Sequence, residues 1–75
     1  HAGVRPDVPL EEQADEDLIW IREPFLNGND HHLPYIVVHG HTPTPNFEVE
    51  VHPHRIGIDT GVCFKGKLTA LPLQY

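Results

Sequence analysis

The sequence predicts an α/β fold in which one short helix precedes several mostly antiparallel strands. An acidic segment, residues 11–17, carries carboxylates suited to the first turn of a helix, and residues 18–22 continue that helix until Pro24 ends it. Beyond Pro24, short stretches that are rich in β-branched residues or that alternate in polarity predict strands, and a turn at residues 65–67 predicts a hairpin before the last one. The expected strands cover residues 35–38, 47–51, 55–59 and 68–73.

The composition limits the kinds of protein that the chain can be. Its 75 residues, 39% of them hydrophobic, predict one small domain, and a formal net charge of −6 disfavours a nucleic-acid partner. The lone Cys63 cannot form an internal disulfide, which fits a reducing cytoplasm, and we expect it to be buried and inert. No apolar run approaches the roughly 20 residues that span a bilayer, and we recognise no signal peptide. We therefore expect a cytoplasmic protein without a membrane partner.

A histidine follows directly on the strand expected at residues 35–38. The β-branched residues there favour a buried, pleated backbone, and Gly40 lets the chain turn sharply where the strand ends. His41 then projects from the rim of the sheet, where a stiff strand holds it in place. Because imidazole is the commonest protein ligand for borderline transition metals, we interpret His41 as a metal ligand. A second signal of this kind opens the chain at His1.

Four short motifs carry a resemblance to a known family. They are His-Ala-Gly at residues 1–3, Leu-Ile-Trp-Ile-Arg at 18–22, Gly-His-Thr at 40–42 and Ile-Asp-Thr-Gly at 58–61. In their order and spacing, the chain resembles the C-terminal part of a bacterial calcineurin-like metallophosphoesterase of the serine/threonine phosphoprotein phosphatase family. The resemblance implies the C-terminal part of a four-layer αββα sandwich. Because the family's N-terminal metal motifs are absent, we expect residues 1–75 to be the C-terminal portion of one domain, with the other half missing.

The resemblance implies roles for three residues. His1 and His41 match family ligands that hold one of two divalent metal ions, for which manganese is the first expectation and iron or zinc would also suit. Arg22 matches a catalytic arginine that binds the substrate phosphoryl group, since a guanidinium can pair with two phosphate oxygens. The implied reaction is hydrolysis of a phosphomonoester, in a phosphoprotein or a small phosphoester, by a hydroxide that the two metals activate. We expect the chain to be inactive alone, because it supplies only part of that site.

Three further polar residues are candidates for supporting the site. His39 precedes Gly40, so its side chain should point to the opposite face of the strand, where it would pack or form hydrogen bonds behind the ligands. Asp59 and Thr60 follow the strand expected at residues 55–59 and could form supporting hydrogen bonds from that end.

The remaining aromatic, basic and histidine residues have no such motif. We expect Trp20 to lie in the core, and Arg5 and Arg55 to lie at the surface. Solvated loop positions are expected for four histidines, which are His31, His32, His52 and His54.

Two alternative functions remain open. Within the same superfamily, the substrate could be a diadenosine polyphosphate or another small phosphoester. In a different class, two His-x-His pairs could each project from one face of a strand and together form the four-histidine site of a small cupin-like or zinc-binding module. These pairs are His39 with His41 and His52 with His54. Pro53 weakens the second pair, and this alternative leaves the other motifs unexplained.

Overall fold

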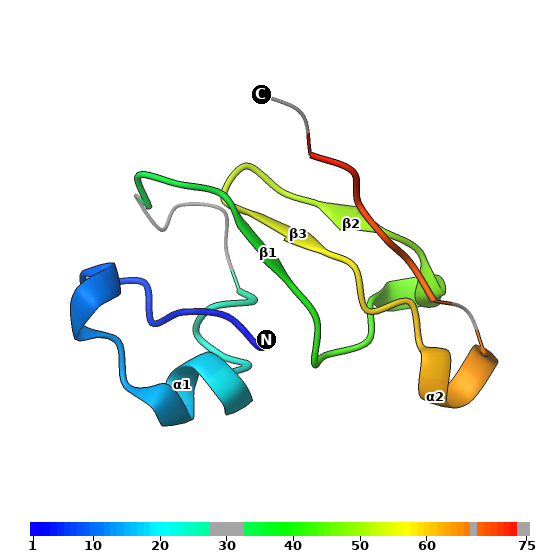
Figure 1. Ribbon diagram of the computed structural model, residues 1–75, viewed down its shortest axis with the longest axis horizontal. Coiled ribbons are helices and arrows are strands. Elements are labelled where there is room, and N and C mark those ends of the chain that lie inside the picture. The colour runs from blue at the N-terminus through cyan, green and yellow to red at the C-terminus, as the bar shows by residue number, and fades with distance from the viewer. Residues whose placement is uncertain (28–32, 67, 74–75) are drawn as a thin grey trace.

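The protein is a small mixed α/β domain with a three-stranded sheet and short helices (Figure 1). The computed structural model describes residues 1–27, 33–66 and 68–73. Within these residues the helices are the 3-10 helices η1 (Leu10–Glu12) and η2 (Pro45–Phe47) and the α-helices α1 (Asp15–Trp20) and α2 (Val62–Lys65). The strands are β1 (Val37–His39), β2 (Glu50–Val51) and β3 (Arg55–Gly57). No described helix is long and apolar enough to cross a membrane.

The sheet has the strand order β1-β3-β2 and combines both kinds of pairing. Strand β2 runs antiparallel to β3, with Val51 opposite Ile56, whereas β1 runs parallel to β3, with His39 opposite Gly57. The expectation of mostly antiparallel strands therefore holds for one of the two pairings. The chain reverses once between β1 and β2 and again between β2 and β3, so β3 returns to the direction of β1.

The expected strands are shorter than predicted, and one region forms a helix instead. The stretch at residues 47–51 contributes only β2, because Pro45 opens a 3-10 turn in which Asn46 and Phe47 adopt positive φ of 58° and 55°. After β3 the chain forms α2, which lies between Gly61 and Gly66, both in the left-handed conformation. Residues 68–73 form no strand, so the predicted hairpin is wrong.

The predicted helix at residues 11–22 is divided into η1 and α1. Gln13 lies between them in an extended conformation. Its side chain accepts a hydrogen bond from the backbone N–H of Arg5 (2.8 Å) and donates to the backbone carbonyls of Arg5 (2.9 Å) and Val8 (2.8 Å). This amide therefore ties the helical region to the preceding loop instead of lying on a continuous helix. Ile21 is extended and ends α1 before Pro24 is reached.

The core lies between the N-terminal segment, α1 and β1. Its buried members surround Phe25, which is fully buried, and a Cβ at Gly3 would collide with the Phe25 ring, so only glycine fits there. The N–H of Ala2 donates to the carbonyl of Leu18 (2.8 Å), and this bond holds the N-terminal segment against α1. The buried apolar residues are Ala2, Val4, Ile21 and Phe25, and the residues packed against them are Leu18, Leu26, Leu33 and Val37.

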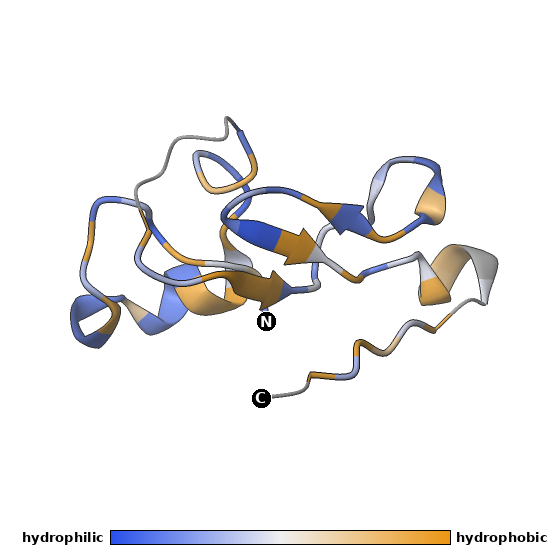
Figure 2. Cartoon of the chain, turned by 90° about the horizontal axis from the view of Figure 1, so that it is seen from above, coloured by the Kyte–Doolittle hydropathy of each residue, from blue (hydrophilic) through white to orange (hydrophobic). Residues whose placement is uncertain are grey.

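Much of the apolar surface remains uncovered. Figure 2 shows hydrophobic residues in α1, in all three strands and in α2, and several of them are on the surface. Trp20 is 67% exposed, so the expectation that it lies in the core is wrong. It is the last residue of α1, and the core lies beneath its neighbour Ile21 instead. Phe64 and Leu68 are even more exposed than Trp20.

Candidate metal-binding site

His1 and His41, the two histidines predicted to bind a metal, lie side by side. The N–H of Gly40 donates to the carbonyl of His1 (2.8 Å), which joins the N-terminal segment to the end of β1. The centroids of the His1 and His41 rings are 5.1 Å apart, with an interplanar angle of 62°. Forty positions of sequence therefore separate two imidazoles that share one small region of the surface.

The separation of these rings fits two ligands of one ion. An imidazole nitrogen binds a transition metal at about 2.1 Å, which places the metal about 3.3 Å from the ring centroid. Two imidazoles on one ion then have centroids about 4.7 Å apart at a ligand angle of about 90°, and about 5.4 Å apart at a tetrahedral angle. The separation of 5.1 Å between the His1 and His41 rings lies within that range.

His41 reaches this position through an unusual backbone conformation. Its φ is 67°, in the left-handed region that residues with a side chain adopt only rarely. The N–H of Thr42 donates to the carbonyl of Gly40 (2.7 Å) and closes the turn tightly around His41. The ring of Trp20 packs edge-on against the His41 ring, with centroids 5.7 Å apart. Exposed Trp20 thus limits the orientations that the His41 imidazole can take.

His1 and His41 are the two candidate ligands that the described residues bring to this position. Among residues 1–27, 33–66 and 68–73, no group of three or more His, Cys, Asp or Glu side chains could hold a metal ion. The histidines of the alternative four-histidine site form no such group among the described residues: both ring nitrogens of His39 face other partners, Arg55 and the Gly40 carbonyl, and the rings of His52 and His54 are 6.4 Å apart. A complete metal site would therefore need ligands from outside these residues.

A cavity of about 320 Å³ lies beside the two histidines. Asp59 and Thr60 line it together with His1, His39 and His41, so the residues expected to support the site are near it. The Asp59 carboxylate accepts a hydrogen bond from the N–H of Gly61 (3.1 Å), and the hydroxyls of Thr60 and Thr69 are 2.6 Å apart. The other lining residues are Val38, Gly40, Ile58, Val62, Leu68 and Thr69.

Arg22 lies just beyond α1, two residues after Trp20. Its side chain is exposed and does not line the cavity beside His1 and His41. Within the part of the chain that the structure describes, it has no hydrogen-bond or ion-pair partner. The exposed guanidinium is thus available to an anion.

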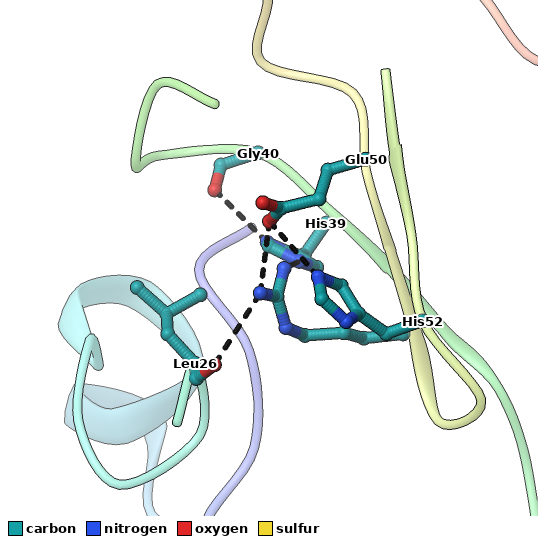
Figure 3. A network of polar contacts seen from close by, with 6 residues as sticks. Leu26, His39, Gly40, Glu50 and His52 are labelled. Carbon is teal, nitrogen blue, oxygen red and sulfur yellow. Dashed lines mark hydrogen bonds and ion pairs between the residues drawn. The ribbon is translucent and has the colours of Figure 1, made fainter. Parts of the chain in front are cut away.

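A buried polar network around Arg55, which the sequence did not predict, lies behind the turn at residues 40–42. Arg55 is only 4% exposed, so the expectation of a surface arginine is wrong. Its Nη2 donates to the carboxylate of Glu50 (2.8 Å) and to the carbonyl of Leu26 (3.3 Å), and its Nη1 donates to Nε2 of His39 (3.1 Å). Figure 3 shows Leu26, His39, Gly40, Glu50 and His52 gathered in this network. The spacing of Glu50 and Arg55 across a short hairpin was the available sequence signal.

The network shifts the ionisation of two of its members. Burial lowers the pKa of His39 below its ordinary value; Arg55 acts in the same direction, while the Gly40 carbonyl and Glu50 oppose it. Burial disfavours the ionised form of Glu50, but the hydrogen bond and charge of Arg55, together with His52, outweigh burial and lower the pKa of Glu50. His39 is therefore neutral and Glu50 ionised at neutral pH.

The remaining predicted positions differ in outcome. His54 is 5% exposed and its ring packs against Phe25, so the expectation of a solvated loop histidine is wrong for it. The cause is the tight connection between β2 and β3, which turns this side chain inward. Cys63 is exposed on α2, so the expectation of a buried thiol is wrong as well. Arg5 is exposed and pairs with Asp17 (3.0 Å), as expected of a surface arginine. His31 and His32 lie outside the described residues.

Comparison of the chain with protein-family models, with curated proteins and with solved structures found no significant match.

Proposed function

We propose that this chain contributes part of the active site of a metal-dependent phosphomonoesterase of the serine/threonine phosphoprotein phosphatase type. The observation that carries the proposal is the convergence of His1 and His41, whose ring centroids are 5.1 Å apart. That separation suits two ligands of one ion, and the same two residues are the ones that the motif resemblance selects. The proposed substrates are phosphoproteins or small phosphoesters.

The residues of this chain would perform two tasks. His1 and His41 would hold one of two divalent ions, manganese in the first instance and iron or zinc otherwise, with their imidazoles neutral. When bound, the two ions would supply Lewis acidity and activate water for attack on phosphorus. Arg22, whose side chain is exposed near Trp20, would bind two phosphoryl oxygens and offset the charge that develops in the transition state.

The remaining ligands would come from another part of the same protein. We propose that residues 1–75 form the C-terminal portion of one cytoplasmic metallophosphoesterase domain with an αββα sandwich. Two observations support this: the described residues form no group of three or more candidate ligands, and large apolar side chains such as Trp20, Phe64 and Leu68 are exposed. We propose that the other part of the domain covers these side chains.

The experiment that tests the proposal uses the whole protein in which the chain occurs. That protein should release phosphate from an aryl phosphate and from a phosphoserine peptide when Mn²⁺ is present. His41→Asn should abolish this release, because one metal would lose a ligand, whereas His32→Asn, at a histidine that belongs to none of the four motifs, should leave it unchanged. A whole protein without carboxylate-rich metal motifs upstream of His1, or with full turnover in His41→Asn, would refute the proposal.

A further inference from the structure

We propose that His39 and Arg55 form a relay that positions His41, by holding the Gly40–His41 peptide in the conformation that aims the His41 ring towards His1. The relay runs from Arg55 on β3, through the His39 imidazole on β1, to the carbonyl of Gly40. Its geometry stands on its own, while its consequence for metal affinity rests on the proposed function.

The two contacts of the His39 ring require the same tautomer. Arginine can only donate hydrogen bonds, so Nε2 of His39, 3.1 Å from Nη1 of Arg55, must be the acceptor and carry no proton. The carbonyl of Gly40 can only accept, so Nδ1 of His39, 3.2 Å away, must be the donor and carry the proton. Each contact separately selects the Nδ1–H form. Arg55 therefore fixes the proton on the nitrogen that faces the Gly40 carbonyl.

The surroundings hold both side chains of the relay in place. The Arg55 side chain is 5% exposed, and its Nη2 is anchored by Glu50 (2.8 Å) and by the Leu26 carbonyl (3.3 Å). Phe25 packs edge-on against the His39 ring, with centroids 4.9 Å apart. Opposite His39 in the sheet is Gly57, where a Cβ would lie 3.5 Å from the imidazole, an ordinary contact distance, so the ring lies directly against this strand position.

The Gly40 peptide transmits this order to the candidate ligand. Its carbonyl accepts from His39 and from the N–H of Thr42, and its own N–H donates to His1. The next residue, His41, has a φ of 67°, which persists in a residue with a Cβ only when surrounding contacts over-determine it. Without the donor from His39, the peptide can rotate and His41 can relax to negative φ. That relaxation would swing its ring away from His1.

The tautomer gives the first test. The full 75-residue chain, isotopically labelled and acetylated at the terminal amine, is examined by long-range ¹H–¹⁵N spectroscopy of its imidazoles above neutral pH. We expect His39 in the Nδ1–H form, in contrast to the Nε2–H form that predominates in a free histidine. A wild-type chain with His39 predominantly in the Nε2–H form would overturn the proposed relay.

The second test uses substitutions that separate the two ends of the His39 ring. His39→Asn places an amide N–H where Nδ1 was and keeps the donor to Gly40, whereas His39→Gln places its amide near the position of Nε2 and loses that donor. Positive φ brings the N–H and Hα of one residue close together, so the intraresidue cross-peak of His41 should remain strong in His39→Asn and weaken in His39→Gln. Equal behaviour of the two variants would show only a packing role and overturn the proposal.

Metal binding is then measured on the same samples by the broadening that Mn²⁺ causes in the His1 ring signals. His39→Asn should bind Mn²⁺ as the wild type does, and His39→Gln should bind it about five- to thirtyfold more weakly, because the left-handed conformation becomes a minor population. Broadening at His1 that persists unchanged in His41→Ala would refute the proposed metal site. The relay would then be judged by the tautomer and the His41 cross-peak alone, so the two failures are distinguishable.

Discussion

Arg55→Met should destabilise the protein far more than Arg5→Met, although both arginines pair with a carboxylate. Methionine keeps most of the side-chain volume but removes all donors. Nε2 of His39 then lies buried without a donor, at a cost of about 1–3 kcal/mol, and Glu50 loses a charge-assisted bond of about 1–2 kcal/mol, reduced because the carboxylate is 27% exposed. Methionine also removes the buried Nε of Arg55, which has no hydrogen-bond partner among the described residues, and this offsets part of the loss. The expected net destabilisation is about 2–4 kcal/mol.

The assay is urea unfolding followed by far-ultraviolet circular dichroism, with Arg5→Met as the matched control. Arg5 also pairs with a carboxylate, Asp17 (3.0 Å), but both groups are accessible to solvent, so its loss should shift the midpoint only slightly. Where Arg55→Met has no folded baseline, a stabilising osmolyte restores a measurable transition for both variants. Free energies of unfolding for Arg55→Met and wild type that agree within about 0.5 kcal/mol would refute the buried-network reasoning.

Substitutions at three further positions and one assay extend the tests. In the whole protein, Arg22→Ala should lower kcat/KM for an aryl phosphate by about ten- to a thousandfold, and Arg22→Lys should recover little of that loss. Unchanged kinetics would show that Arg22 does not bind the phosphoryl group. The 75-residue chain alone should release no phosphate in Mn²⁺, and clear turnover would contradict a divided site. Because the pKa of Glu50 is lowered, its ionised form stabilises the fold above about pH 4.3, and this contribution is lost as pH falls through the lowered value. The stability difference between wild type and Glu50→Gln, measured from neutral to acidic pH, should therefore shrink; a constant difference would contradict it. Gly40→Ala should keep the His1 and His41 rings in contact, and loss of their mutual cross-peaks would show otherwise.

The sequence predicts those features of the fold that are encoded locally. The β-branched run at residues 35–38 predicts a strand, and β1 begins there at Val37. The alternating stretch at residues 47–51 contains β2, and the strand expected at residues 55–59 contains β3. By contrast, η2 and the division of the first helix depend on a positive φ at Asn46 and on the side chain of Gln13. Neither changes the hydrophobic period on which the predictions were based.

The candidate site also has one part that the sequence predicts and one part that it does not. His41 can be predicted from its place at the end of a strand, because a strand end fixes where the next side chain emerges. The network behind it cannot, because its contacts join Arg55 to His39, 16 positions away, and to Leu26, 29 positions away. An isolated arginine in a polar hairpin is ordinarily a surface residue. Only the parallel pairing of β1 with β3, which the expectation of mostly antiparallel strands did not include, places Arg55 beside the strand that carries His39.

Gly40 contributes to the site through the hydrogen bonds of its backbone, and not through the conformational freedom of glycine. The sequence suggests that glycine is needed there for a sharp turn, but its φ lies outside the left-handed region, and the residue that takes positive φ is His41. A Cβ at Gly40 would lie 3.8 Å from the carbonyl oxygen of His1, an ordinary contact distance. What Gly40 contributes is its backbone: the N–H binds His1 and the carbonyl binds His39. One peptide segment thus couples the two candidate ligands to the buried network, and the strain that this requires is carried by His41 itself.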